Sequence, residues 1–214
     1  MLGRRSPSVP RIVAIGDSII EGTGATENHG WIYLFAQQFR SDFELINNGE
    51  GGSTTEYWVR HLQADCIDLR PSIVILGIGT NDARYRPSIN RSEVPLESFE
   101  KNLSWILKTI RRKTSARILV SGQTPVLDKY ANPYKDDKSH IRNLQPPYEH
   151  AIYQATAREG VLYFDNFARW LSHGEDFIER SLADGLHPNN AGHAEIARYA
   201  HYFFLLHSDA QGPS

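Results

Sequence analysis

The chain has 214 residues and a mass of 24.3 kDa, which fits one domain better than two, because a domain commonly holds about 150 residues. Hydrophobic residues make up 40% of the chain and charged residues 22%, and these proportions exclude collagen, coiled coil and bulk disorder. The 23 basic and 25 acidic residues give a net charge of −2. The sequence has no basic cluster of the kind that binds nucleic acid or an anionic membrane, so we expect neither as a partner.

The single cysteine, Cys66, excludes an intrachain disulfide and favours a reducing compartment. We expect Cys66 to be a small buried residue near a helix. No apolar run approaches the roughly 18 residues of a spanning helix. Pro7 and Pro10 stand where a signal peptide would carry apolar residues. These features predict a cytoplasmic protein, and they leave its oligomeric state open.

Strand and helix patterns alternate along the chain. In chain order they predict a strand at 11–16, a helix at 31–40, a strand at 43–47, a helix at 54–64, a strand at 72–77, a helix at 96–113, a strand at 116–121, a helix at 148–159, a strand at 161–164 and a helix at 189–206. This alternation predicts an α/β fold: a three-layer α/β/α sandwich around a five-stranded parallel sheet, with the flavodoxin-like strand order 2-1-3-4-5. Residues 11–206 would form a single domain. Residues 1–10 are predicted to be a disordered leader, and 207–214 a flexible tail.

Polar or glycine-rich segments follow the predicted strands, and ligands of such sheets bind beyond the carboxyl ends of the strands. Gly16-Asp17-Ser18 follows the first strand, residues 47–54 (NNGEGGST) the second, and residues 79–82 (GTND) the third. Residues 184–188 (DGLHP) lie well after the fifth strand. All four segments are therefore expected at one edge of the sheet.

These segments hold the groups that acyl transfer needs. A serine hydroxyl must be deprotonated by a base, and an imidazole base needs a carboxylate on its other nitrogen. Ser18 could supply the hydroxyl, while Asp184 and His187 are close enough in sequence to act together from one turn. A developing oxyanion could receive the backbone N–H of Gly52 and the side-chain amide of Asn81.

This ordered set of segments resembles the SGNH hydrolases, the GDSL-type esterases and lipases. The resemblance covers residues 16 to 188 and implies a Ser18–His187–Asp184 catalytic triad. It also implies an oxyanion hole formed by the N–H groups of Ser18 and Gly52 and by Asn81. The chemistry that this resemblance implies requires no metal or cofactor. Ile19 stands where the short family motif has leucine, and the choice of Gly52 over Gly49 or Gly51 depends on how the loop is aligned.

The expected function is hydrolysis of small carboxylic esters through an acyl-enzyme, with carbohydrate acetyl esters and thioesters also open. An acyltransferase with the same triad and an idle binding module of the same fold are the alternatives. The motifs G-x-S-x-G of α/β-hydrolases, Gly-Lys-Ser/Thr of P-loops, G-x-G-x-x-G of dinucleotide folds and H-E-x-x-H of zinc proteases are all absent.

Two segments, 83–95 and 123–148, could form a lid or line the substrate pocket, or could be solvated surface. If Arg84 or Arg86 faces the site, an acidic or phosphorylated substrate would be favoured. The eight histidines other than His187 are expected in helices or exposed loops without a matching acid. Among these, His193 should pack at the start of the last helix.

Overall fold

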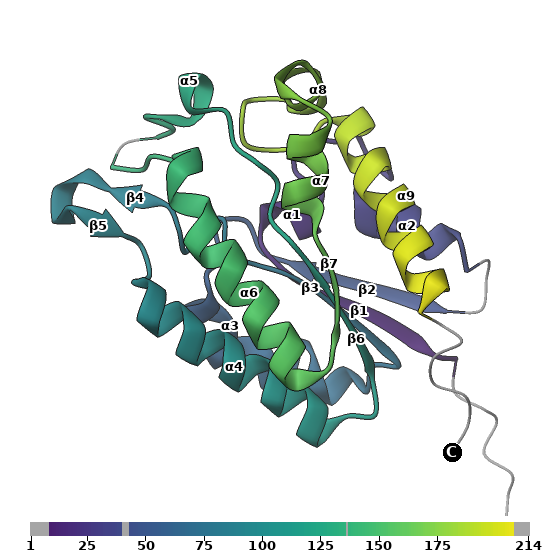
Figure 1. Cartoon of the computed structure of the whole chain (residues 1–214). Helices are drawn as coiled ribbons and strands as arrows, with labels where there is room; N and C mark the ends of the chain where they lie inside the picture. The colour runs from purple at the N-terminus through teal and green to yellow at the C-terminus, as the bar shows by residue number, and fades with distance from the viewer. Residues whose placement is uncertain (1–8, 40–42, 136, 208–214) are drawn as a thin grey trace, which may run out of the picture.

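Five parallel strands form one sheet through the centre of the molecule (Figure 1). The computed structural model describes residues 9–39, 43–135 and 137–207. The strands are β1 (Arg11–Gly16), β2 (Glu44–Gly49), β3 (Ile73–Gly77), β6 (Arg117–Ser121) and β7 (Leu162–Phe164). Their spatial order is β2-β1-β3-β6-β7, which confirms the predicted order 2-1-3-4-5.

Helices cover both faces of this sheet (Figure 1). The α-helices are α1 (Ser18–Glu21), α2 (Trp31–Gln37), α3 (Thr55–Asp65), α4 (Leu96–Lys113), α5 (Asp128–Ala131), α6 (Gln145–Glu159), α7 (Asn166–Ser172), α8 (Glu175–Ser181) and α9 (Asn190–Leu206). The three-layer α/β/α architecture is therefore confirmed.

Alternation along the strands divides the core into two halves, because successive side chains of a strand point to opposite faces. Val13 and Ile15 of β1 pack with the helices α3, α4 and α6, whereas Ile12 and Ala14 pack with α2, α7 and α9. All four are fully buried. Cys66, directly after α3, is likewise buried in the first half, as expected.

Three predicted boundaries were wrong by two or three residues, and the others lie within one residue of the observed ends. Strand β2 runs on to Gly49, since its last residues still pair with β1. Helix α2 ends at Gln37 rather than at residue 40, which lies outside the described residues. Helix α6 begins at Gln145, because prolines are tolerated in the first turn, where their missing N–H groups are not needed.

Several short elements were not predicted from the sequence. The segment 83–95 contains a small hairpin of β4 (Tyr85–Arg86) and β5 (Arg91–Ser92). The segment 123–148 is not a simple loop, since it holds α5 and the start of α6. Helices α7 and α8 follow β7.

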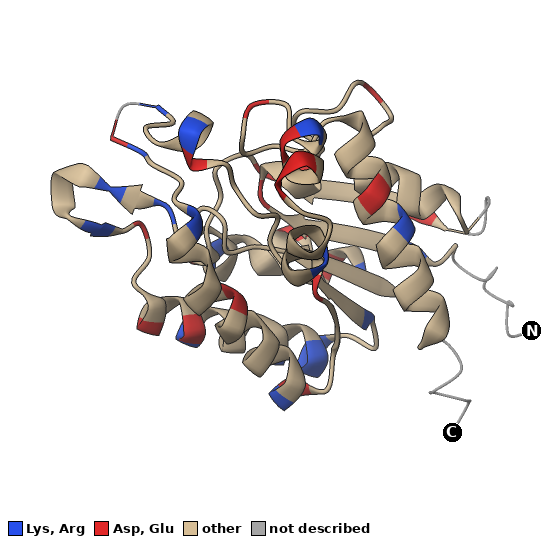
Figure 2. Ribbon diagram, turned by 45° about the horizontal axis from the view of Figure 1, so that its top comes forward, with Lys and Arg blue, Asp and Glu red and all other residues tan. Residues whose placement is uncertain are grey.

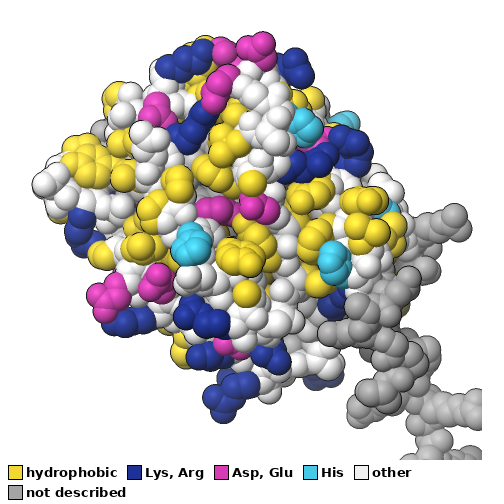
Figure 3. Space-filling model, in the orientation of Figure 1, with side chains coloured by type: hydrophobic (Ala, Val, Ile, Leu, Met, Phe, Trp, Pro, Cys, Tyr) yellow, Lys and Arg dark blue, Asp and Glu magenta, His cyan; other side chains and the backbone are white. Residues whose placement is uncertain are grey.

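The surface mixes charged and apolar side chains on the face shown in Figure 3. No helix in the described part of the chain is long and apolar enough to cross a membrane. The predicted leader and tail fall largely on residues 1–8 and 208–214, which lie outside the described residues.

Candidate active site

The four polar segments meet at the carboxyl edge of the sheet. The first is tied to the second by Ser53, whose hydroxyl donates to the carbonyl oxygen of Gly16 at 2.8 Å. The second is tied to the third by Asp82, whose Oδ1 accepts hydrogen bonds from the Thr55 N–H at 2.9 Å and the Thr55 hydroxyl at 2.6 Å. The buried aspartate of GTND thus fixes the start of α3, directly after the glycine-rich loop.

Ser18 is the first residue of α1, immediately after β1 ends. The preceding Asp17 caps this helix, since its Oδ1 accepts from the Ile19 N–H at 2.9 Å. Gly16 has φ +150°, and a Cβ there would lie 2.0 Å from the carbonyl oxygen of Gly77. The strand can therefore turn sharply into the helix only with glycine at this position, and the turn leaves Ser18 half-buried at the sheet edge.

Ser18, His187 and Asp184 form one chain of hydrogen bonds. The hydroxyl oxygen of Ser18 lies 2.9 Å from Nε2 of His187, and Nδ1 of the same ring lies 2.8 Å from Oδ2 of Asp184. Oδ1 of Asp184 also accepts the backbone N–H groups of His187 at 2.7 Å and Leu186 at 3.0 Å. A carboxylate at Nδ1 favours the tautomer with the proton there, which leaves Nε2 free to accept the serine proton.

Asp184 is ionised in this setting. Its partial burial works to raise its pKa, but the hydrogen bonds from the ring and backbone of His187 outweigh that effect and hold the pKa well below its usual value. Two other acids behave in the opposite way, because burial raises the pKa of Asp17 to about 6 and that of Asp82 to about 7.

The expected oxyanion donors lie on the glycine-rich loop and beside it. Gly52 has φ +80° and nothing within 4 Å of where a Cβ would stand, so no neighbour covers that side of the residue. Among the hydrogen bonds of the described residues, none is donated by the N–H of Gly52 or of Ser18. The side-chain nitrogen of Asn81 donates to the carbonyl oxygen of Ser53 at 3.1 Å, which leaves its second N–H for another acceptor.

Two neighbours of the predicted triad were not found from the sequence. The hydroxyl of Tyr134 donates to Oδ2 of Asp184 at 3.2 Å, and its ring meets that of His187 edge-on at 6.0 Å between centroids. His140 was expected in a helix or an exposed loop, but it is buried beside Tyr134, with 3% of its surface exposed. Burial, then the charges of Arg84 and His187, lower the pKa of His140 to about 3. No local pattern marks either residue, since their place depends on packing against parts of the chain that are distant in sequence.

The structure gives both arginines of the segment 83–95 protein partners. Arg84 Nη2 lies 3.0 Å from Glu93, and Arg86 pairs with Glu93 at 2.8 Å and with Asp137 at 2.9 Å. Tyr85 exchanges two backbone hydrogen bonds with Ser139, so the segments 83–95 and 123–148 pack against each other. The charges of Arg84 and Arg86 are thus compensated within the protein.

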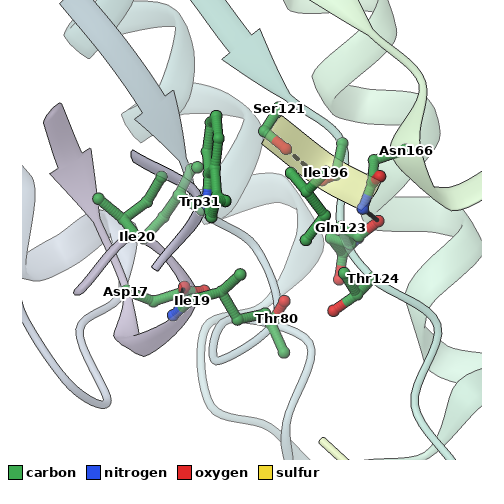
Figure 4. Close-up of a pocket in the computed structure, with 13 residues that line it drawn as sticks. Asp17, Ile19, Ile20, Trp31, Thr80, Ser121, Gln123, Thr124, Asn166 and Ile196 are labelled. Carbon is green, nitrogen blue, oxygen red and sulfur yellow. Dashed lines mark hydrogen bonds between the residues drawn. The ribbon is translucent and has the colours of Figure 1, made fainter. Parts of the chain in front are cut away.

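A small cavity lies against the residues on either side of Ser18 in the chain. Figure 4 shows Asp17 and Ile19 on one side of it, and Gln123 and Asn166 on the other. The cavity offers about 20 Å³ to the centre of a water molecule, which is about enough for one water. Within the described residues, no group of three or more His, Cys, Asp or Glu side chains is arranged to hold a metal ion.

Comparison with known proteins places the chain in a family. Residues 14–195 match the GDSL-like lipase/acylhydrolase family. The chain belongs to this family. Its members hydrolyse acyl esters, so the protein is a carboxylic ester hydrolase with small-molecule ester substrates, and the resemblance found in the sequence is confirmed.

Individual relatives are distant. An uncharacterized lipoprotein of Bacillus subtilis is 27% identical over 51% of this chain, and the match spans only 47% of that lipoprotein. The platelet-activating factor acetylhydrolase IB subunit alpha1 of Bos taurus is 24% identical over 92% of this chain and 75% of its own length. The fold is similar to that of an acetylxylan esterase from Geobacillus stearothermophilus, with a TM-score of 0.71, 18% identity, and coverage of 91% of this chain and 93% of that one.

Proposed function

We propose that the protein is a serine esterase in which Ser18 is the nucleophile and His187 the general base, oriented by Asp184. The observation that carries this proposal is the continuous chain of hydrogen bonds at 2.9 and 2.8 Å through these three side chains. Contact between a hydroxyl and an imidazole, with a carboxylate on the far nitrogen, is the arrangement that activates a serine.

In the acylation step, Nε2 of His187 takes the proton from Ser18 as the serine oxygen attacks the ester carbonyl. The carbonyl oxygen becomes an oxyanion, which accepts hydrogen bonds from the N–H groups of Ser18, Gly52 and Asn81. His187 then protonates the leaving alcohol, and the acyl group remains on Ser18. Water, deprotonated by His187, attacks this acyl-enzyme. His187 then donates that proton to the departing oxygen of Ser18 as the carboxylic acid is released.

We propose a short acyl group, of which acetyl is the best candidate. The cavity behind α1, which Asp17 and Ile19 line but Ser18 does not, has room for about one water, so it could not take a long acyl chain. Two relatives support the same direction through their names, an acetylhydrolase and an acetylxylan esterase. The compensated charges of Arg84 and Arg86 give no support to an acidic or phosphorylated substrate.

The test is hydrolysis of p-nitrophenyl acetate, butyrate, octanoate and palmitate by the wild type, by Ser18→Ala and by Ser172→Ala as the control. Ser172 is an exposed serine at the end of α7. We expect the highest kcat/KM on acetate, a loss of about 10⁴-fold or more in kcat for Ser18→Ala, and wild-type rates for Ser172→Ala. Equal rates in the wild type and Ser18→Ala would refute the assignment of the nucleophile, and a palmitate optimum would refute the short acyl group.

A further inference from the structure

The side-chain amide of Asn81 is held at both of its ends. Its nitrogen donates to the carbonyl oxygen of Ser53 at 3.1 Å, and its oxygen accepts from Nη1 of Arg84 at 3.1 Å. Rotating the amide by half a turn would set its oxygen against the Ser53 carbonyl and its NH₂ against the guanidinium. Both contacts would then be repulsive, so only one orientation of Asn81 is favourable.

Arg84 is well placed to impose this orientation. It is buried, with 8% of its surface exposed, and its guanidinium spans two partners, Asn81 through Nη1 and Glu93 through Nη2 at 3.0 Å. Glu93 is fixed in turn by Arg86, which also pairs with Asp137. The result is a row of alternating charges that runs from the β4–β5 hairpin, where Figure 2 shows basic residues, to the third oxyanion donor.

We propose that Arg84 is a positioning residue of the reaction, which orients and polarises the Asn81 amide as an oxyanion donor. This inference rests on the proposed function, because it assumes that the free N–H of Asn81 meets the oxyanion. From the sequence, Arg84 was expected only as a contact for an acidic substrate. The geometry instead directs its charge at the oxygen of a catalytic amide.

The physical effect acts on the transition state. A cation at the amide oxygen draws electron density from the nitrogen, so the N–H groups become stronger donors, and linked hydrogen bonds strengthen one another in this way. A donor polarised before reaction stabilises the charge that develops on the oxyanion more than it stabilises the neutral ester carbonyl. Removing Arg84 should therefore lower kcat and leave KM nearly unchanged.

The experiment is a double-mutant cycle with p-nitrophenyl acetate. It compares Arg84→Met, Asn81→Ala and the double variant with the wild type, and thermal unfolding checks that each variant folds. We expect Asn81→Ala to lose about 10²–10³-fold in kcat and Arg84→Met about 10- to 50-fold, the range of a charge-assisted hydrogen bond. The double variant should be no slower than Asn81→Ala, because Arg84 acts through that residue.

Matched variants separate this role from simple support of the fold. Arg91→Met removes an exposed arginine of the same hairpin, whose side chain bonds to the carbonyl oxygen of Ser92 rather than to Asn81 or Glu93, and should change kcat by less than about threefold. Arg84→Lys keeps a cation and should fall between the wild type and Arg84→Met, and this variant carries the test if Arg84→Met does not fold.

Three results would overturn the inference. The first is a wild-type kcat in Arg84→Met. The second is that Arg84→Met lowers kcat by the same factor in the presence and absence of Asn81. The third is an equal loss of kcat in Arg84→Lys and Arg84→Met. Failure of the proposed function has a different signature. Full kcat in Asn81→Ala would remove Asn81 from the oxyanion hole, and full kcat in Ser18→Ala would remove the proposed mechanism itself.

Discussion

Replacing Asp82 by asparagine should reverse part of the pH dependence of stability. Burial raises the pKa of Asp82 from 3.8 to about 7 in the folded protein, and its Oδ2 is buried without a partner among the described residues. A carboxyl group whose pKa is raised on folding stabilises the protein fully below its unfolded pKa, and this contribution is lost as the pH rises through the folded pKa. Between pH 4 and 7 the folded state of the wild type therefore binds an extra proton at Asp82.

The magnitude follows from this difference. One bound proton changes the free energy of unfolding by about 1.4 kcal/mol per pH unit, or at most about 4 kcal/mol between pH 4 and 7. In Asp82→Asn the amide keeps an oxygen for Thr55 but does not titrate, so the stability of the variant relative to the wild type should rise with pH by up to this slope.

The assay is urea unfolding of both proteins at half-unit steps from pH 4 to 7.5. Asp17 and Glu149, whose pKa values burial also raises, titrate in both proteins and cancel to first order. Ser172→Ala, an exposed substitution that changes no titratable group, serves as the control and should show no such slope. A constant free-energy difference between Asp82→Asn and the wild type over this range would refute the reasoning.

Three further predictions concern the site. Asp184→Asn should fold, since the amide oxygen can still accept the backbone N–H groups, but it should lose about 10⁴-fold in kcat; urea unfolding and ester kinetics check both parts, and a loss under tenfold would contradict the role of the carboxylate. Tyr134→Phe should lower kcat by less than about tenfold, since it removes one neutral hydrogen bond and leaves the other donors to Asp184 in place; a loss as large as that of Asp184→Asn would show a greater role for the phenol. Gly49→Ala should destabilise the fold more than Gly52→Ala in thermal unfolding. A Cβ at Gly49 would lie 2.2 Å from a backbone nitrogen of α1, whereas a Cβ at Gly52 meets only the strain of a positive φ. A greater loss of stability in Gly52→Ala would contradict this.

Much of the fold could be predicted because hydrophobic patterns report burial directly. The buried run at residues 73–77 and the amphipathic stripe of 96–113 each carry a signal strong enough to place an element. The boundaries that failed lie where tertiary contacts decide. Strand β2 continues through Asn47 and Asn48 because β1 pairs with them, although asparagine disfavours strands.

The candidate site also divides into a part that the sequence predicts and a part that it does not. Short polar segments at strand ends allowed Ser18, Asp184 and His187 to be chosen before their distances were known, since parallel strands bring their carboxyl ends to one edge. The surrounding contacts could not be predicted from local sequence. Tyr134 reaches Asp184 across 50 positions of the chain, and Arg86 reaches Asp137 across 51. Such contacts depend on how the loops pack, which no short pattern encodes.

The most direct test of the central claim is to identify the residue that becomes covalently modified. The protein is treated with a fluorophosphonate, a reagent that phosphonylates an activated serine, and the digested chain is analysed by mass spectrometry. We expect one adduct per chain, on Ser18, formed in step with loss of esterase activity and absent from Ser18→Ala. Inactivation with the adduct on another residue, or esterase activity that survives full modification of Ser18, would contradict it.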